Sequence, residues 1–258
     1  MNTFTIKSRE NKNIAIDLYN EDKSFDKILI FIGGDGDDKE YLIPFNTVLA
    51  NSISCPLVSF DYSSMEGDFR ANEKYKYAIN EAIEVIKYFS NKYRTSEIIL
   101  ACTSAGSIPT TYALLDLVSS RISKAIYLDP ANYYVTKEGQ STKDGEWTGN
   151  HDYKPQFPTL SSLMKSITSN TKVYVTPFTI RNSKGNQYVD PEFRGIDHEG
   201  LLTRISVEST KSFYNNTPEK NKGEYIEINT VPHAFLRDGN IDSNIRALVD
   251  LIKRIGEI

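Results

Sequence analysis

Cysteine and histidine are scarce in this chain of 258 residues, and their scarcity excludes several kinds of site. Its two cysteines, Cys55 and Cys102, are too few for a disulfide scaffold. They lie far along the chain from one another and from the three histidines, so the ligand spacing of a zinc site is missing. We therefore expect no metal and no other cofactor, and a reduced, cytoplasmic setting.

Long apolar runs and a basic excess are missing as well. No stretch approaches the roughly 18 uninterrupted apolar residues of a membrane span, and residues 1–10 lack the apolar core of a secretory signal. With 30 basic against 34 acidic residues, the formal net charge is −4, which offers nothing to attract a nucleic-acid backbone or a membrane surface. We therefore expect a small-molecule partner, with no nucleic acid and no membrane span.

Short apolar segments alternate with amphipathic helical patterns through most of the chain. After an opening hairpin at 3–7 and 13–19, strands are predicted at 27–32, 57–61, 97–101, 125–128, 173–180 and 224–228. Helices are predicted at 72–93, 107–119, 201–214 and 241–255. The apolar runs are continuous, which is typical of strands buried on both faces. The pattern predicts one α/β domain over 1–258, with a mostly parallel sheet of about eight strands flanked by helices and a ligand site at their carboxyl ends.

One segment, 131–170, breaks this alternation. It is rich in Tyr, Thr, Gly and Pro and holds Trp147, the sole tryptophan. Long segments without a structural pattern are usually functional or disordered. We expect an insertion over the site, in the position of a lid or cap, and a surface loop without a role in binding is the alternative.

A serine follows the strand at 97–101. The residues after it read Cys102-Thr103-Ser104-Ala105-Gly106, and a helix begins at once. Small neighbours allow a tight strand-to-helix turn that places the serine hydroxyl above the sheet edge. The backbone N–H groups at the start of the helix point to the same place. A serine at a helix start is also a common N-cap, so this segment alone favours the capping interpretation.

A glycine-rich turn, Gly33-Gly34-Asp35-Gly36, follows the strand at 27–32. It favours the interpretation of Ser104 as a catalytic nucleophile over that of a helix cap. A turn at this place in an α/β fold supplies N–H groups that stabilise an oxyanion. We predict Ala105 and either Gly34 or Asp35 as the donors. The alternative is a turn without such a role. The segment lacks the third glycine of a dinucleotide fingerprint and the ligands of an EF-hand loop.

His233 is the candidate base. It follows the last predicted strand in Val231-Pro232-His233-Ala234-Phe235 and precedes the closing helix. The other histidines, His151 and His198, do not follow strands.

From Gly33 through the closing helix, the chain resembles the α/β-hydrolase superfamily of serine esterases and lipases. Ser104 in Cys-Thr-Ser-Ala-Gly is similar to the nucleophile of that family, and His233 in Pro-His-Ala-Phe is similar to its base. Cys102 stands where the motif G-x-S-x-G has its first glycine. The resemblance implies a catalytic triad, an oxyanion hole and an acyl-enzyme intermediate.

The triad's acid has several candidates. Most family members carry it after the seventh strand, where this chain has Asn186, and asparagine can orient an imidazole without offsetting its charge. Pancreatic-type lipases and haloalkane dehalogenases carry it after the sixth strand, where this chain has Asp129. We expect Asp129, with Asp190 as the alternative and then Asp197 or Glu192. Asp129 could also simply begin a turn with the proline that follows.

The resemblance implies a carboxylesterase or lipase-like enzyme acting on the acyl bond of a small molecule. A thioesterase of a biosynthetic pathway is the second possibility within the same chemistry. A catalytically degenerate binding protein with this fold, or a regulatory protein in which Ser104 is a helix cap, are the alternatives from other classes.

Overall fold

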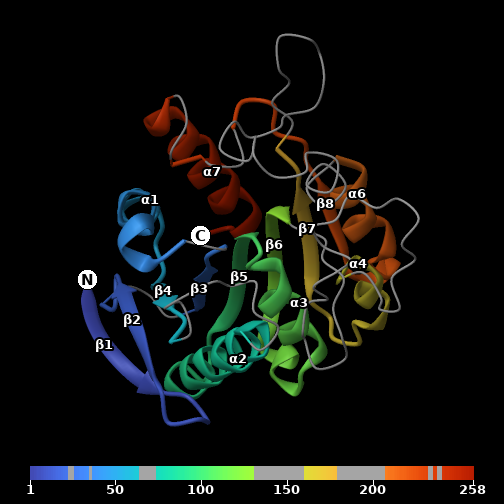
Figure 1. Ribbon diagram of the computed structural model, residues 1–258. Helices are drawn as coiled ribbons and strands as arrows, with labels where there is room; N and C mark the ends of the chain where they lie inside the picture. The colour runs from blue at the N-terminus through green and yellow to red at the C-terminus, as the bar shows by residue number, and fades with distance from the viewer. Residues whose placement is uncertain are drawn as a thin grey trace.

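The computed structural model describes residues 1–22, 26–34, 37–63, 74–130, 160–178, 207–231, 235–236 and 240–258. Its strands form one eight-stranded sheet in the order β1-β2-β4-β3-β5-β6-β7-β8 (Figure 1). The strands are β1 (Asn2–Lys7), β2 (Asn13–Tyr19), β3 (Lys27–Ile32), β4 (Leu57–Asp61), β5 (Glu97–Ser104), β6 (Ile122–Pro130), β7 (Lys172–Thr176) and β8 (Lys222–Tyr225). β1 and β2 are antiparallel to their neighbours, and the others run parallel. The predicted mostly parallel sheet is confirmed.

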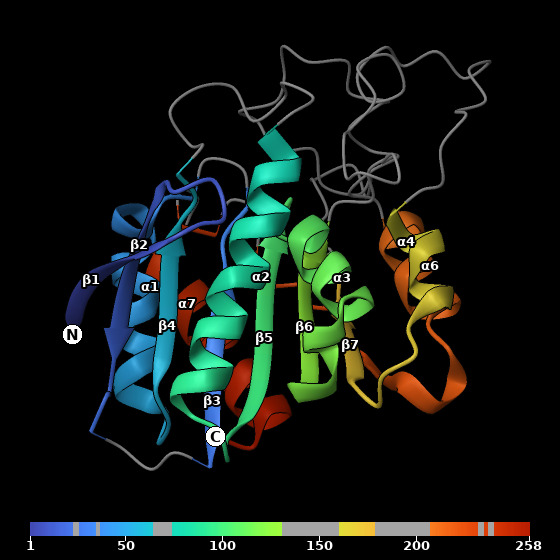
Figure 2. The same cartoon turned by 90° about the horizontal axis from the view of Figure 1, so that it is seen from below.

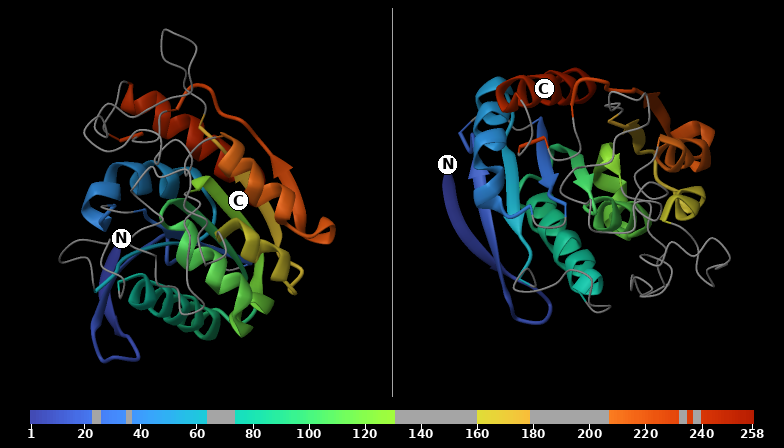
Figure 3. Two further views of the ribbon diagram at one scale, coloured as in Figure 1. Left: turned by 45° about the vertical axis from the view of Figure 1, so that its right-hand side comes forward. Right: turned by 45° about the horizontal axis from the view of Figure 1, so that its top comes forward.

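Helices cover both faces of the sheet. They are α1 (Lys39–Ser52), α2 (Lys74–Lys92), α3 (Ser107–Leu115), α4 (Leu160–Leu163), α6 (Val207–Asn216) and α7 (Ile241–Gly256). Short 3₁₀ turns are η1 (Leu117–Arg121), η2 (Met164–Ser166) and η4 (Glu219–Asn221). Helices α1 and α7 lie on one face and α2 with α3 on the other, while α4 and α6 lie side by side near β7 (Figures 2 and 3). The described helices include none that is long and apolar enough to cross a membrane.

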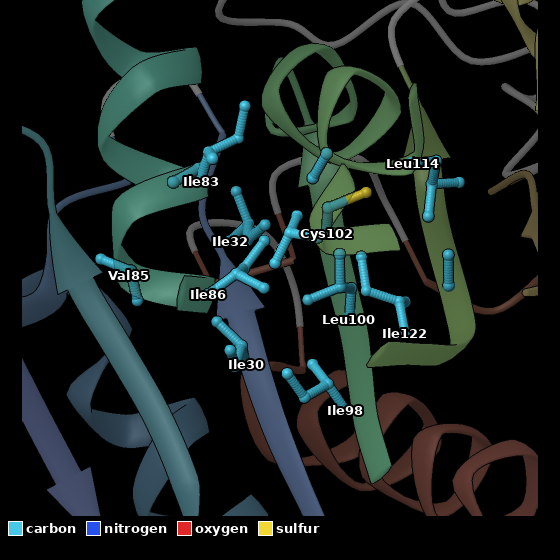
Figure 4. Packing of buried hydrophobic residues seen from close by; sticks show 14 of the residues in the cluster. Ile30, Ile32, Ile83, Val85, Ile86, Ile98, Leu100, Cys102, Leu114 and Ile122 are labelled. Carbon is cyan, nitrogen blue, oxygen red and sulfur yellow. The ribbon is translucent and has the colours of Figure 1, made fainter. Parts of the chain in front are cut away.

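The central strands are mostly apolar, and β3 is apolar from Ile28 to Ile32, because each of its faces packs on helices. In β3, Ile30 and Ile32 point to the core beneath α2 and α3, and Phe31 points to the core beneath α1 and α7. Figure 4 shows Ile30 and Ile32 beside Ile86 of α2 and Leu100 of β5. Burying such a side chain stabilises the fold by about 1.5–3 kcal/mol, which explains why the pattern identified these strands.

Helix α1 was not predicted from the sequence. Pro44 lies inside it, and a proline in a helix interior removes a backbone hydrogen bond and costs about 3 kcal/mol. The helix forms because Asp38 caps it, accepting a hydrogen bond from the Tyr41 N–H, and because it buries an apolar face. That face consists of Leu42, Phe45, Leu49 and Ala50. Their spacing and Asp38 were the signals available in the sequence.

Other element boundaries shift by a few residues. The helix predicted at 107–119 ends at Leu115 and is followed by η1, and the strand predicted at 224–228 is β8 followed by a bridge between Ile228 and Phe178. The predicted helix at 201–214 corresponds to α6, and 201–206 lie outside the described residues.

The last part of the segment 131–170 belongs to the core. It forms α4 and η2, and Leu160 and Met164 are fully buried beside the sheet face that carries α3. Residues 131–159 lie outside the described residues, so an insertion acting as a lid stays a prediction for them.

Candidate functional site

Ser104 lies at the carboxyl end of β5, immediately before the turn that leads into α3. Its φ of 45° is in the left-handed region, which costs a non-glycine residue about 1–2 kcal/mol. Its side chain is half-buried at the sheet edge. A strained serine on a strand-to-helix turn is the local geometry that presents a hydroxyl above a sheet.

The small residues around Ser104 are required by close backbone contacts. A Cβ atom at Gly106 would lie 2.5 Å from the Ile32 carbonyl oxygen and 2.6 Å from that of Gly33, so no larger residue fits. Cys102 is fully buried and points to the core beneath α2 and α3 (Figure 4). Burial raises the pKa of its thiol to about 12, so Cys102 stays protonated and fills space.

The glycine turn after β3 packs directly against Ser104. A Cβ atom at Gly34 would lie 2.9 Å from the Ser104 Cβ, so the absence of a side chain there leaves room beside the serine. The Gly34 N–H donates to the Asp37 Oδ2 at 2.8 Å, and Asp35 lies outside the described residues. Ala105, the other predicted donor, is buried at the start of the turn that follows Ser104.

Asp37 joins this turn to the end of β5. Its Oδ2 accepts from the Gly34 N–H and also from the Thr103 hydroxyl at 3.1 Å. The same carboxylate oxygen therefore fixes the positions of the residue before Ser104 and of the glycine beside it. Sequence reasoning missed both Asp37 and Thr103. An aspartate in a glycine-rich turn commonly bonds nearby backbone, but nothing in the sequence links it to a threonine 66 positions away.

Asp129 lies near the carboxyl end of β6, the strand next to β5. The register pairs Ser104 with Pro130, so the two candidate residues occupy adjacent strand ends. Asp129 is 2% exposed, has a φ of 46°, and accepts a hydrogen bond from the Phe178 N–H at 3.1 Å through its Oδ1. A buried carboxylate requires hydrogen-bond donors, and the segment after β7 supplies one of them.

The chain after β8 approaches the same region. Ile228 bridges to Phe178, and the Ile228 N–H donates to the Pro177 carbonyl at 2.9 Å. Val231 is fully buried in the core cluster that contains Leu128 and Phe178.

Several predicted site residues lie outside the described residues. These are Asp35, Asn186, Asp190, Glu192, Asp197 and all three histidines, His151, His198 and His233. The structure therefore brings together Ser104, Ala105, Gly34 and Asp129, and the assignments of the base and of the alternative acids stay predictions.

Two carboxylates, one fully buried and one half-buried, tie the end of β4 to its helices. Glu81 of α2 is fully buried and accepts hydrogen bonds from the N–H and the hydroxyl of Ser63. Asp61 accepts from the Lys39 N–H at the start of α1. Burial raises the pKa of both carboxyl groups, most of all through the loss of hydration. Within the described ranges, no group of three or more His, Cys, Asp or Glu residues is arranged to hold a metal ion.

No protein-family model and no curated protein sequence matches the chain. Solved structures do match it. An alpha-beta serine hydrolase homologue from Coxiella burnetii is 12% identical, with a TM-score of 0.62 over 98% of this chain and 96% of that chain. An esterase from Pyrococcus furiosus is 14% identical, with a TM-score of 0.64 over 98% and 89%. A highly thermostable carboxyl esterase from Bacillus coagulans is 9% identical, with a TM-score of 0.64 over 98% of each chain. At these identities the likeness is one of fold.

Proposed function

We propose that this chain, which has the α/β-hydrolase fold, is a serine hydrolase that cleaves an ester or related acyl bond of a small molecule. The observation that carries the proposal is the placement of Ser104. It lies on a strained turn at the carboxyl end of β5, beside a glycine turn and one strand away from a buried aspartate. In parallel α/β sheets this edge is where ligands bind.

In the proposed reaction, His233 removes the proton from the Ser104 hydroxyl as its oxygen bonds to the substrate's carbonyl carbon. The carbonyl oxygen becomes an oxyanion, which backbone N–H groups stabilise. His233 then gives the proton to the leaving alcohol, and the acyl group remains on Ser104 as an ester. Water, activated by His233, releases the acid and restores the serine.

Ala105 and Asp35 are the proposed oxyanion donors. The Gly34 N–H already donates to Asp37, so Asp35 is favoured over Gly34 as the second donor. Gly34 instead contributes by lacking a side chain, because a Cβ atom at this position would clash with Ser104. Asp37 is then a positioning residue, which holds the turn against the end of β5.

Asp129 is the proposed acid. It is buried on the strand beside β5, and the Phe178 N–H donates to its Oδ1, which fixes the orientation of the carboxylate. Val231 is fully buried and therefore fixed in the core. His233 is two residues further along the chain, and two residues span at most about 7 Å, so the backbone of His233 stays within that distance of Val231. In this role Asp129 selects the imidazole tautomer and stabilises the imidazolium. Asp190 is the alternative acid.

The substrate class is proposed from the chemistry of the site and from the solved relatives. Two of these relatives are named as esterases, and a serine nucleophile with an oxyanion hole suits carboxylic esters. A small-molecule carboxylic ester is therefore the first substrate to test, and a thioester is the second.

The test is covalent labelling with a fluorophosphonate, read by intact mass. Such probes react with a serine that a base and an oxyanion hole have activated. We expect one adduct on the wild-type protein and none on Ser104→Ala. Ser54→Ala, which changes an exposed serine after α1, is the matched control and should label like the wild type.

Labelling that persists in Ser104→Ala would place the reactive serine elsewhere and refute the assignment. A wild-type protein that never labels would refute the hydrolase and favour a binding protein with this fold. A labelled protein would next be assayed with short-chain esters and the matching thioesters, and the ratio of their kcat/KM values identifies the preferred bond.

A further inference from the structure

A polar pocket of about 520 Å³ lies at the end of the sheet opposite to Ser104. The segments that lead into β5, β6 and β7 form it, so it lies at the amino ends of these strands, at the lower ends of β5 and β6 in Figure 2. Ser104 and Asp129 lie at the carboxyl ends of the same strands. The pocket is therefore separate from the proposed catalytic site.

Two arginines line this pocket, and neither has a carboxylate partner among the described residues. Arg94 is exposed and forms no hydrogen bond or ion pair with any described residue. Arg121 is half-buried, and its Nη2 donates to the carbonyl oxygens of Tyr93 at 3.2 Å and Ser96 at 2.9 Å. These two bonds fix the guanidinium group of Arg121, while its other N–H groups have no partner in the described part of the chain.

Further polar groups surround the two guanidinium groups. The lining includes Thr168 and Asn170, and the Thr168 carbonyl accepts from the Lys220 ammonium at 3.0 Å, which brings a third cation to the rim. Glu97 is the one acidic residue among those that line the pocket. A concave surface with this excess of positive charge is unexpected in a chain whose formal net charge is −4.

We propose that this pocket binds a phosphoryl group. The guanidinium group carries its N–H donors in a planar fork that matches two oxygens of a phosphate, and hydroxyl and amide groups can satisfy the remaining oxygens. A volume of about 520 Å³ exceeds that of a phosphate ion and lies within the range of small-molecule sites. The phosphoryl group therefore belongs either to free phosphate or to a small phosphate monoester.

The test is calorimetric titration of the full chain with inorganic phosphate and, separately, with glycerol 3-phosphate, at constant ionic strength. We expect saturable binding at one site. Arg94→Gln should weaken it about tenfold, which is the usual effect of losing one charge-assisted hydrogen bond. Arg246→Gln removes an exposed arginine of α7 that has no partner among the described residues and does not line the pocket, and this variant should bind like the wild type.

Glu97→Gln provides a test in the other direction, because removing a like charge from beside a bound anion should tighten binding. Arg121 is left unchanged, since its contacts with two carbonyls make it part of the fold. Tighter binding of glycerol 3-phosphate than of phosphate would identify a monoester as the ligand, and equal binding would identify free phosphate.

Absence of saturable binding with either probe would overturn the proposal, as would equal weakening by Arg94→Gln and Arg246→Gln. The titration does not depend on hydrolysis. Ser104→Ala protein should give the same binding curve, so a failure here is distinct from a failure of the proposed enzyme activity.

Discussion

The candidate site depends on a few residues whose backbones or charges are costly in a folded chain. Ser104 and Asp129 both adopt left-handed φ angles, and Asp129 is also buried. Such residues persist where surrounding contacts hold them, as Gly34, Thr103 and Phe178 do here. The site can therefore be tested one side chain at a time.

Asp129 is expected to control turnover through its charge. Asp129→Asn keeps the size and one acceptor oxygen, so the Phe178 N–H can still bond, but the imidazolium loses its counter-charge. We expect kcat for an ester substrate to fall by several orders of magnitude with little change in fold. Steady-state kinetics of this variant should be compared with those of Asp190→Asn. Full activity in Asp129→Asn and loss in Asp190→Asn would move the acid to Asp190.

Asp37 is expected to act through position. In Asp37→Ala the Gly34 N–H and the Thr103 hydroxyl lose their shared acceptor, and the turn beside Ser104 is no longer held. A small displacement of catalytic groups can cost up to about 100-fold in rate, so we expect kcat to drop while KM changes little. Asp37→Asn retains an oxygen acceptor and should restore most of the rate. If the asparagine variant were as slow as the alanine variant, the charge of Asp37 would be what matters.

At the scale of elements, the site is assembled by contacts between segments that are distant in the sequence. Gly106, at the start of α3, packs on the carbonyls that end β3, and the segment after β7 donates to the carboxylate of β6. Helix α2 is likewise linked to the end of β4 through Glu81 and Ser63. These contacts fix the positions of the strand ends relative to one another. The contribution of each contact can be measured as the change in the free energy of unfolding when it is removed.

Glu81 should make the stability of this link depend on pH. Burial raises its folded-state pKa above the ordinary value of 4.5, so the folded state holds this proton more tightly than the unfolded state. Its contribution is therefore fully favourable below pH 4.5 and is lost as the pH rises through the folded-state pKa.

Glu81→Gln can keep both contacts with Ser63, because a hydroxyl accepts as well as donates. Its free energy of unfolding relative to the wild type, measured by urea denaturation, should increase from pH 4.5 towards neutrality. Glu84→Gln changes a more accessible carboxylate of the same helix, paired with Arg9, and is the control. It should stay within about 1 kcal/mol of the wild type. A flat difference for Glu81→Gln across this range would contradict the argument.

At the scale of the whole molecule, the sequence was informative where one physical effect dominates. Continuous apolar runs located β3 and β4 with the bounds that the structure has, because strands buried on both faces are mostly apolar. Helix α7 was equally clear from the apolar face that it buries, whereas its cap, Asn240, was not predicted. Helix α1 was not, since the cost of Pro44 is offset by burial against the sheet, which only the tertiary structure reveals.

The candidate site likewise has parts that the sequence predicted and parts that it did not. Ser104 was found from a local pattern, since the small residues around it reflect a turn whose geometry is set within a few residues. The Asp37–Thr103 contact joins two strand ends and has no local pattern, and neither do the contacts of Arg121 with two carbonyls at the other end of the sheet. Contacts of this kind depend on the register between strands, which a single sequence does not encode in any short segment.

The left-handed backbone at Ser104 lowers the stability of the fold, so a substitution at this position could raise it. Glycine adopts this conformation without strain, so Ser104→Gly should unfold at a higher urea concentration than Ser104→Ala, although both lack the hydroxyl. A midpoint for the glycine variant at or below that of the alanine variant would show that the turn is not strained. If it is strained, selection for thermal resistance alone would favour glycine at this position and discard the reactive group. The serine would then persist only in lineages that also select for turnover.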